Sequence, residues 1–369
     1  MKNYHGIIFA YSAAPELRDL VNARTAASLP FCGRYRLIDF SLSSMRNAGI
    51  LDVGVVMQRD YQSLLDHIGS GKAWDMSRRT GGLRMLPPFG LPEYHNGQYN
   101  GTIEALNAVA PYIRDIPQKN VVLMLGNLCA NIDLEAAMSS FEQSGADITA
   151  ICGGVSPEEG LVNSYVLGED GFVKEHLYTA DKAGFPSLEC YIVRKSVLLE
   201  MMDMCRARGL YRFHEDAINA FLADGGKMSV YLHEGYAATI RTVDAYYKAS
   251  MDMLCRENRR MLFPANRPVR TKNHEEVSTY YGENALCKNS LVADNCIVEG
   301  DVEDCIVFSG ARIAPGAKLR RCIVMRGCVI GEGAQLESVI ADKYSKFSAG
   351  TVLVGSPKLP MVVPKNAKI

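Results

Sequence analysis

Short apolar segments alternate with amphipathic ones over the first two thirds of the chain. Runs of consecutive apolar residues predict buried strands at 6–10, 53–57, 121–125 and 147–152. Apolar positions spaced three to four residues apart predict helices at 41–48, 102–113 and 133–144. Strands that alternate with crossover helices build a mostly parallel, Rossmann-like sheet with helices on both faces. Such a sheet places ligands beyond the carboxyl ends of its strands.

The pattern changes after a proline-punctuated connector at 263–268. Beyond it, small and aliphatic residues recur at an offset of 17 positions, in the columns Gly310/Gly327, Ile313/Ile330/Phe347, Gly316/Gly333/Gly350 and Leu319/Leu336/Leu353. This repeat divides into three short strands per turn, which predicts a β-helix of hexapeptide repeats with aliphatic residues inside and glycines at the corners. A rod of few coils exposes its ends, so we expect it to pack on a partner.

These patterns divide the chain into three parts. Residues 1–245 form the predicted α/β domain, 246–284 a helix and linker, and 285–369 the predicted β-helix. The α/β domain is expected to carry any chemistry, whereas the repeats are expected to be structural.

Composition narrows the class of protein. The chain has 369 residues with 40 basic and 41 acidic side chains, a formal net charge of −1, which disfavours binding to nucleic acid or to an anionic membrane surface. Its 11 cysteines include no Cys-x-x-Cys pair, so neither a disulfide framework nor a zinc knuckle is predicted. No apolar run approaches the roughly 20 residues of a membrane-spanning helix. We expect a cytoplasmic protein.

A motif near the N-terminus resembles a known family. Residues 24–50 read RTAASLPFCGRYRLIDFSLSSMRNAGI. The glucose-1-phosphate adenylyltransferase (ADP-glucose pyrophosphorylase) family has Arg-Ala-Lys-Pro-Ala-Val-Pro-Phe-Gly-Gly-Lys-Tyr-Arg-Leu-Ile-Asp-Phe here. The matching positions are Pro30, Phe31, Gly33, Tyr35, Arg36, Leu37, Ile38, Asp39 and Phe40. The resemblance continues through 63–71, 100–102, 242–247 and the repeats, and so covers essentially the whole chain.

The resemblance implies a GT-A-like nucleotidyltransferase domain followed by a left-handed β-helix. The family makes ADP-glucose and pyrophosphate from ATP and glucose 1-phosphate. This reaction needs a glycine-rich turn whose N–H groups approach the triphosphate, and basic side chains that neutralise charge at the α-phosphorus. It also needs carboxylates that hold magnesium between the phosphates.

The chain departs from the family at the phosphate-binding positions. The family pattern Ala-Gly-Gly-x-Gly-x-Arg-Leu falls on residues 10–17, so Ala10 is kept while Tyr11, Ser12 and Ala14 replace the glycines and Glu16 replaces the arginine. The lysine of Arg-Ala-Lys-Pro falls on Ala26. Side chains now stand where the backbone should touch phosphate, and a negative charge replaces a positive one.

The two carboxylates that the resemblance assigns to magnesium are also missing. The family's Gly-Asp-His aligns with residues 126–128, which puts Asn127 at the first position, and the second falls on Thr239. Loss of one preorganised charge typically costs about 3 kcal/mol of transition-state stabilisation, or roughly a hundred- to thousand-fold in rate. We therefore predict that the chain is catalytically inactive alone and holds no cofactor of its own.

Within the family, the chain resembles the GlgD-type subunit of bacterial glycogen synthesis, notably at 65–75, 81–83, 86–89 and 348–353. This resemblance implies a regulatory role in a hetero-oligomer, expected to be a tetramer, with an active GlgC-type subunit that uses the Mg²⁺. A homo-oligomer is expected for the isolated chain.

Other residues carry both a functional and a structural interpretation. Gly101, Thr102 and Glu104 occupy the family's Gly-Thr-Ala-Asp-Ala element, and Asp216 keeps a family aspartate, so they form either a residual ligand pocket or helix starts. Trp74 is a candidate for an effector pocket, an interface or the core. Arg320, Arg321 and Arg326 are candidates for a sugar-phosphate or nucleotide effector, with a solvated basic face favoured. We expect structural roles for His67, His95, His214 and His233.

Three other functions remain as alternatives. One is a weakly active adenylyltransferase, whose rate the changes Glu16→Arg, Ala26→Lys, Asn127→Asp and Thr239→Asp would improve. Another is a sensor that binds a sugar phosphate or nucleotide without turnover. An acyltransferase is disfavoured, because the last histidine, His274, precedes the coils.

Overall fold

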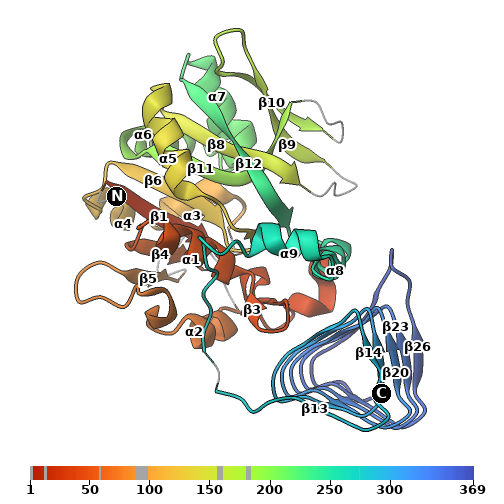
Figure 1. Cartoon of the computed structure of the whole chain (residues 1–369). Coiled ribbons are helices and arrows are strands. Elements are labelled where there is room, and N and C mark those ends of the chain that lie inside the picture. The colour runs from red at the N-terminus through yellow and green to blue at the C-terminus, as the bar shows by residue number, and fades with distance from the viewer. Residues whose placement is uncertain are drawn as a thin grey trace. The chain divides into compact units, whose positions relative to one another are not determined.

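A computed structural model describes residues 3–11, 15–57, 60–87, 99–155, 161–179, 184–273 and 275–369. The chain forms two compact units, and each is assembled from segments that are distant in the sequence (Figure 1). The first unit comprises Met1–Ala13, Ile38–Thr239 and Leu262–Arg270. The second comprises Ala14–Leu37, Ile240–Met261 and Thr271–Ile369, so two earlier segments join the C-terminal repeats in one unit.

A mixed sheet forms the centre of the first unit. Its main path runs β5 (Leu83–Leu86), β4 (Val53–Val56), β1 (Tyr4–Phe9), β6 (Asn120–Leu125), β11 (Phe185–Arg194), β8 (Ile148–Val155), β12 (Met228–Thr239) and β7 (Leu128–Ala130). Two further strands branch from β11, namely β9 (Val162–Leu167) and β10 (Val173–Thr179).

The sheet is less parallel than the alternation of strands and helices predicts. Strands β5, β4, β1 and β6 pair in parallel, but β11 is antiparallel to both β6 and β8. Strand β10 also pairs antiparallel with β9, and β9 with β11. Short connections join antiparallel neighbours, whereas a parallel pair needs a long crossover. Apolar runs reveal strands but not these directions.

Helices cover both faces of this sheet. Ile7 and Phe9 share a core with α3 (Thr102–Ala108), α4 (Ala110–Asp115) and α6 (Lys195–Ala207). On the opposite face, Gly6 leaves room for Met45 of α1 (Ile38–Asn47), since an added Cβ would lie 2.2 Å from the Met45 sulfur. Helix α5 (Leu134–Ser144) packs beside α1. The remaining helical elements of this unit are α2 (Gln62–Ile68), η3 (Lys72–Trp74), a π-helix η4 (Phe213–Ile218) and α7 (Asn219–Ala223).

The predicted elements of this region are present with small shifts of their ends. The four predicted strands correspond to β1, β4, β6 and β8. Helix α5 begins after Asp133, whose carboxylate accepts a hydrogen bond from the Ala136 N–H, and it ends at Gly145 in the left-handed conformation. The helix predicted at 102–113 is instead two helices, α3 and α4, which meet at Val109 just before Pro111. Proline interrupts a helix because it lacks an N–H donor.

The second unit contains the β-helix, whose three sheets each have one strand per coil (Figure 1). One sheet consists of β13 (Tyr280–Tyr281), β16 (Ile297–Val298), β19 (Arg312–Ile313), β22 (Val329–Ile330) and β25 (Lys346–Phe347). The next consists of β14 (Cys287–Lys288), β17 (Asp301–Glu303), β20 (Lys318–Arg320), β23 (Gln335–Glu337) and β26 (Val352–Val354). The third consists of β15 (Leu291–Val292), β18 (Ile306–Val307), β21 (Ile323–Val324), β24 (Val339–Ala341) and β27 (Met361–Val363).

The register confirms the 17-residue repeat over its central coils. Ile313 lies beside Ile330 and Ile330 beside Phe347, and their side chains fill the interior. One turn near the start is shorter, because Cys287 lies beside Val302 and Ile297 beside Arg312, in each case 15 positions later. The last is longer, because Ile340 lies beside Val362, 22 positions later. Gly316 and the other predicted corner glycines have positive φ angles, a backbone conformation that glycine adopts without strain.

Two earlier segments complete the second unit. The first contains η1 (Pro15–Val21), η2 (Ala26–Ser28), β2 (Pro30–Phe31) and β3 (Tyr35–Arg36). The second contains α8 (Val243–Asp252) and α9 (Arg256–Leu262). The Tyr246 hydroxyl donates to the Pro30 carbonyl at 2.7 Å, and the Tyr247 hydroxyl donates to the Arg321 carbonyl at 2.7 Å. Helix α8 therefore contacts both the N-terminal segment and a corner of the β-helix.

None of the helices in the described ranges is both long and apolar enough to cross a bilayer.

Candidate functional site

The carboxyl ends of the central strands bring several predicted site residues together. Ala10 and Tyr11 follow β1, and the Ala10 N–H donates to the Val56 carbonyl at 2.9 Å. The Gly126 N–H, just beyond β6, donates to the Phe9 carbonyl at 2.8 Å. The ends of β1, β4 and β6 are therefore level, and Asn127 follows directly after Gly126.

The two positions assigned to metal carboxylates also lie together. Thr239 is paired with Leu128, the residue after Asn127. Asn127 and Thr239 are buried, with 5% and 7% of their surfaces exposed. An amide and a hydroxyl carry no charge to balance Mg²⁺, which prefers carboxylate ligands. These residues do not fit a magnesium site, and no cluster of three His, Cys, Asp or Glu among the described residues fits a metal ion either.

Tyr11 occupies the space at the end of β1. Its ring packs edge-on against Phe9 and Tyr99, with centroid separations of 5.8 and 5.2 Å. Burial raises the pKa of Tyr11 well above its usual value, and the charges of neighbouring groups, including Glu104, raise it further. A packed aromatic ring with acidic neighbours disfavours a triphosphate. Ser12 and Ala14 lie outside the described residues.

The other residues predicted to form a ligand pocket, among them Gly101, Glu104 and Asp216, make structural contacts near the starts of helices. A Cβ added to Gly101 would lie 2.2 Å from the Tyr211 carbonyl oxygen, so only glycine fits there. The Glu104 carboxylate accepts a hydrogen bond from the Asn100 N–H, one turn earlier. Asp216 accepts hydrogen bonds from the N–H groups of Tyr211 and Arg212 at 3.1 and 2.8 Å. These contacts favour the helix-start interpretation of all three residues.

A buried chain of hydrogen bonds links β11, β9 and the π-helix η4. The Tyr191 hydroxyl lies 2.8 Å from the Ser187 hydroxyl and 2.5 Å from His214 Nε2. His214 Nδ1 lies 3.3 Å from the Asn163 amide, whose oxygen lies 2.8 Å from His176 Nε2. His214 is thus bonded through both ring nitrogens to neutral groups of the protein. This arrangement supports the structural interpretation of His214.

The two lost basic positions lie in the second unit. Glu16 is exposed in η1, and Ala26 is fully buried in η2. The arginine that remains nearby, Arg24, is 4% exposed and contacts the Asp342 carboxylate with one guanidinium nitrogen at 2.7 and 2.6 Å. Asp342 is itself fully buried, so a buried ion pair holds the N-terminal segment on the β-helix.

Lys343 adds a second cation to this region. Burial, together with the positive charges of Arg36, Arg24 and Lys365, lowers the pKa of Lys343 to about 7, and the negative charge of Asp342 opposes this shift. Asp342 was not identified from the sequence, although a signal exists. In the register of the coils it follows Phe308 and Met325, both buried and apolar, so an acidic residue there departs from the column.

Trp74 belongs to the core of the first unit. It has no exposed surface and packs edge-on to His67 at a centroid separation of 5.9 Å. His67 Nε2 lies 2.6 Å from the buried Asp39 carboxylate. A fully buried indole offers no face to an effector or a partner, which favours the core interpretation. His233 is likewise buried near the Tyr236 carbonyl, and His95 lies outside the described residues.

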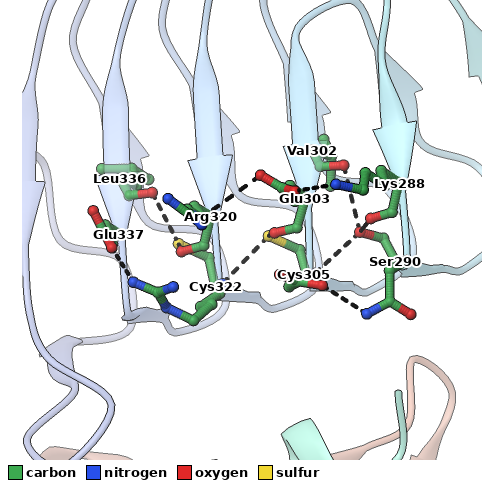
Figure 2. Close-up of polar contacts among 12 residues, drawn as sticks. Lys288, Ser290, Val302, Glu303, Cys305, Arg320, Cys322, Leu336 and Glu337 are labelled. Atoms are coloured by element: carbon green, nitrogen blue, oxygen red, sulfur yellow. Dashed lines mark hydrogen bonds and ion pairs between the residues drawn. The ribbon is translucent and has the colours of Figure 1, made fainter. Parts of the chain in front are cut away.

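The three arginines of the repeats contact carboxylates, as Figure 2 shows for Arg320 beside Glu303. Arg320 lies 3.8 Å from Glu303 on the preceding coil, and Arg321 forms an ion pair with Glu337. Arg326 lies 3.0 Å from Glu276. Because each guanidinium has a carboxylate beside it, the cluster is poorly suited to capture an anionic effector.

The fold and the site define a class of protein in which a nucleotidyltransferase domain precedes a hexapeptide β-helix. Residues 5–166 match the family model described as nucleotidyl transferase. Residues 275–358 match the model described as GlmU-like, C-terminal hexapeptide.

Comparison with individual proteins narrows this class. The chain is 32% identical over 361 residues to the glycogen biosynthesis protein GlgD of Bacillus subtilis, covering 98% of this chain and 95% of that protein. It is 30% identical over 326 residues to a glucose-1-phosphate adenylyltransferase of Halalkalibacterium halodurans, with coverages of 86% and 84%. A similar enzyme of Geobacillus stearothermophilus is 30% identical over 327 residues, with coverages of 85% and 82%. The chain belongs to the glucose-1-phosphate adenylyltransferase family and is a homologue of GlgD.

Proposed function

We propose that this chain is a non-catalytic regulatory subunit of a bacterial glucose-1-phosphate adenylyltransferase, and that it acts in the cytoplasm in glycogen biosynthesis. Its partner is an active, GlgC-type member of the family. The partner supplies the Mg²⁺ site and the chemistry, and this chain changes the partner's rate or its response to effectors.

One observation carries the proposal. The strands that surround the candidate site are present, but the charged side chains that the reaction needs are replaced by neutral ones. Thr239 is paired with Leu128, the residue after Asn127, and neither Asn127 nor Thr239 offers the carboxylate that a metal would need. At the neighbouring strand end, the Tyr11 ring fills space against Phe9 and Tyr99. Since this reaction depends on preorganised charge, such a site offers no route to appreciable turnover.

A reconstitution assay tests the proposal. ADP-glucose formation from ATP, glucose 1-phosphate and Mg²⁺ is measured for this chain alone, for an active family member from the same organism alone, and for the two mixed at several ratios. We expect no rate above background for the chain alone. In the mixture we expect a changed kcat, KM or effector response that saturates with added chain.

Two further results would contradict the proposal. Robust turnover by the chain alone would show that the site is active as it stands. An unchanged rate in the mixture, together with separate elution of the two proteins in size-exclusion chromatography, would show that no regulatory complex forms. Heat-denatured chain at the same ratios is the control for nonspecific stabilisation of the active enzyme.

A further inference from the structure

One face of the β-helix carries two columns of outward side chains. This face consists of β14, β17, β20, β23 and β26, and we call it the ladder face. Val302, Leu319 and Leu336 point into the core of the coils, and the residues on either side of each point outward. From the first coil to the fifth, one column reads Leu286, Asp301, Lys318, Gln335 and Val352, and the other reads Lys288, Glu303, Arg320, Glu337 and Val354.

Charge alternates along this face. Lys288 Nζ lies 2.7 Å from the Glu303 carboxylate, and Arg320 lies on the other side of Glu303 at 3.8 Å (Figure 2). Asp301 lies beside Lys318 in the other column. These side chains remain accessible, with 77% of Lys288, 37% of Glu303 and 55% of Arg320 exposed. Three acidic and three basic residues make the ladder face neutral in sum, which disfavours a polyanionic or polycationic partner.

We propose that the ladder face pairs with the same face of a second copy of this chain, with the two coil axes antiparallel. In this arrangement the two-fold axis runs along the strand direction, between β17 and β20. It reverses the order of the coils in the second copy, so that each column of one copy faces the same column of the other. Glu303 then faces Arg320 of the second copy, Asp301 faces Lys318, and Lys288 faces Glu337. Every such contact occurs twice, as a closed two-fold interface requires.

The other two-fold arrangement brings like charges together. In that arrangement the two-fold axis runs parallel to the axis of the β-helix. Each coil then faces the same coil of the second copy, and each column faces the other column. Asp301 would then face Glu303, and Lys318 would face Arg320, in both halves of the interface. Like-charge contacts across an interface cost several kcal/mol and exclude the wrong partner or register. The charge pattern therefore selects the antiparallel arrangement.

Exposed apolar residues at the ends of the ladder face match the same arrangement. Leu286, Val352 and Val354 are 67%, 59% and 60% exposed. In the antiparallel pair the fourth coil of one copy faces the first coil of the other. The fifth coil therefore lies one strand spacing, about 4.8 Å, beyond the first coil of the second copy. Val352 of one copy then reaches Leu286 of the other. A shallow hollow of about 280 Å³ between Asp301 and Val354 accommodates side chains of the second copy.

A charge exchange in trans tests this pairing. Asp301→Lys and Lys318→Asp are made separately, and the association of each protein is measured by sedimentation velocity over a range of concentrations and salt. We expect the wild type to associate in a salt-sensitive step. Each single variant should associate at least tenfold more weakly, because two like-charge contacts form in every pair.

Mixing separates this contact from the ion pairs within one chain. The D301K chain has lysine at both positions, and the K318D chain has aspartate at both. In an equimolar mixture, each contact between these positions in a mixed pair therefore joins opposite charges. Association should return to the wild-type level, although each chain keeps its own like-charged neighbours.

Two further variants complete the design. The double variant D301K/K318D restores opposite charges in every pair and should associate like the wild type. The control Lys346→Asp lies in the first of the three sheets, away from the ladder face, and should change nothing.

Several outcomes would overturn the proposal. They are a wild-type chain that stays monomeric at all concentrations, a mixture of the variants that associates no better than either one, and association that occurs only with an active family member. Circular dichroism during thermal unfolding confirms that each variant is folded, which is expected because the substituted side chains are not buried.

Discussion

The carboxyl ends of the central strands and the second unit differ in the charge of their buried polar residues. At the strand ends, Asn127 and Thr239 are neutral and buried. In the second unit, Arg24 and Asp342 are charged and equally buried, but each is the partner of the other. A buried carboxylate is tolerated where the protein supplies its counter-ion, and is costly where the counter-ion must come from outside. With the function proposed here, Asn127 and Thr239 avoid the cost of burying two carboxylates that only a metal ion could neutralise.

The largest effect should follow from breaking the buried ion pair. Asp342→Asn leaves the Arg24 guanidinium buried without its counter-ion, which should lower the free energy of unfolding by about 3–5 kcal/mol. Urea denaturation with an unchanged m-value measures this. Lys288→Met breaks an exposed pair of the same length and should cost less than about 1 kcal/mol. Equal losses in the two variants would show that burial does not distinguish the pairs.

Restoring the carboxylates at the strand ends should have a smaller effect of the same sign. The double variant Asn127→Asp/Thr239→Asp introduces two carboxylates at buried positions, and we expect a loss of about 2–3 kcal/mol at neutral pH in the presence of EDTA. Each single variant should lose less than half of that. A double variant as stable as the wild type in EDTA would mean that water reaches the strand ends.

Millimolar Mg²⁺ sharpens the same experiment. It should recover part of the loss in the double variant and leave the wild type unchanged, because a ligand that binds only the folded state stabilises it.

The smallest effect should be the pH dependence contributed by Lys343. Its pKa is lowered to about 7 in the folded chain, from 10.5 for an ordinary lysine. Between these two values the unfolded chain binds more protons, so this group makes stability rise with pH, and its full penalty is present below pH 7. Between pH 6.5 and 7.5 the change should be less than about 1 kcal/mol.

The variant Lys343→Met isolates this contribution. The unfolding free energy of the wild type should rise relative to that of the variant as the pH increases. A difference independent of pH would show that Lys343 titrates normally.

Much of the fold could be predicted from the sequence because its periodicities are local. Apolar runs located β1, β4, β6 and β8, and the recurrence of Ile313 at Ile330 revealed the coils. The antiparallel direction of β11 could not be predicted, since it depends on how its neighbours connect. The shorter turn between Cys287 and Val302 could not be predicted from the repeat, because a spacing of 15 residues does not align at an offset of 17.

The contacts of the candidate site could not be predicted from the sequence. Resemblance to the family implied that Asn127 and Thr239 belong to one site, and in the structure Thr239 pairs with Leu128, the residue after Asn127. It could not show that Tyr11 packs against Tyr99, or that Arg24 contacts Asp342, since these contacts depend on residues far apart in the sequence. Arg320, Arg321 and Arg326 appeared as a basic cluster because their acidic neighbours lie on other coils or segments.

The ion pair between Arg24 and Asp342 joins residues 318 positions apart. At synthesis rates of about 5–20 residues per second, roughly 15–60 seconds pass between the synthesis of Arg24 and that of Asp342. During that time the N-terminal segment lacks the coil that carries the partner of Arg24. This segment therefore completes its packing only after translation has reached the last coils, although it is among the first parts of the chain to be synthesised.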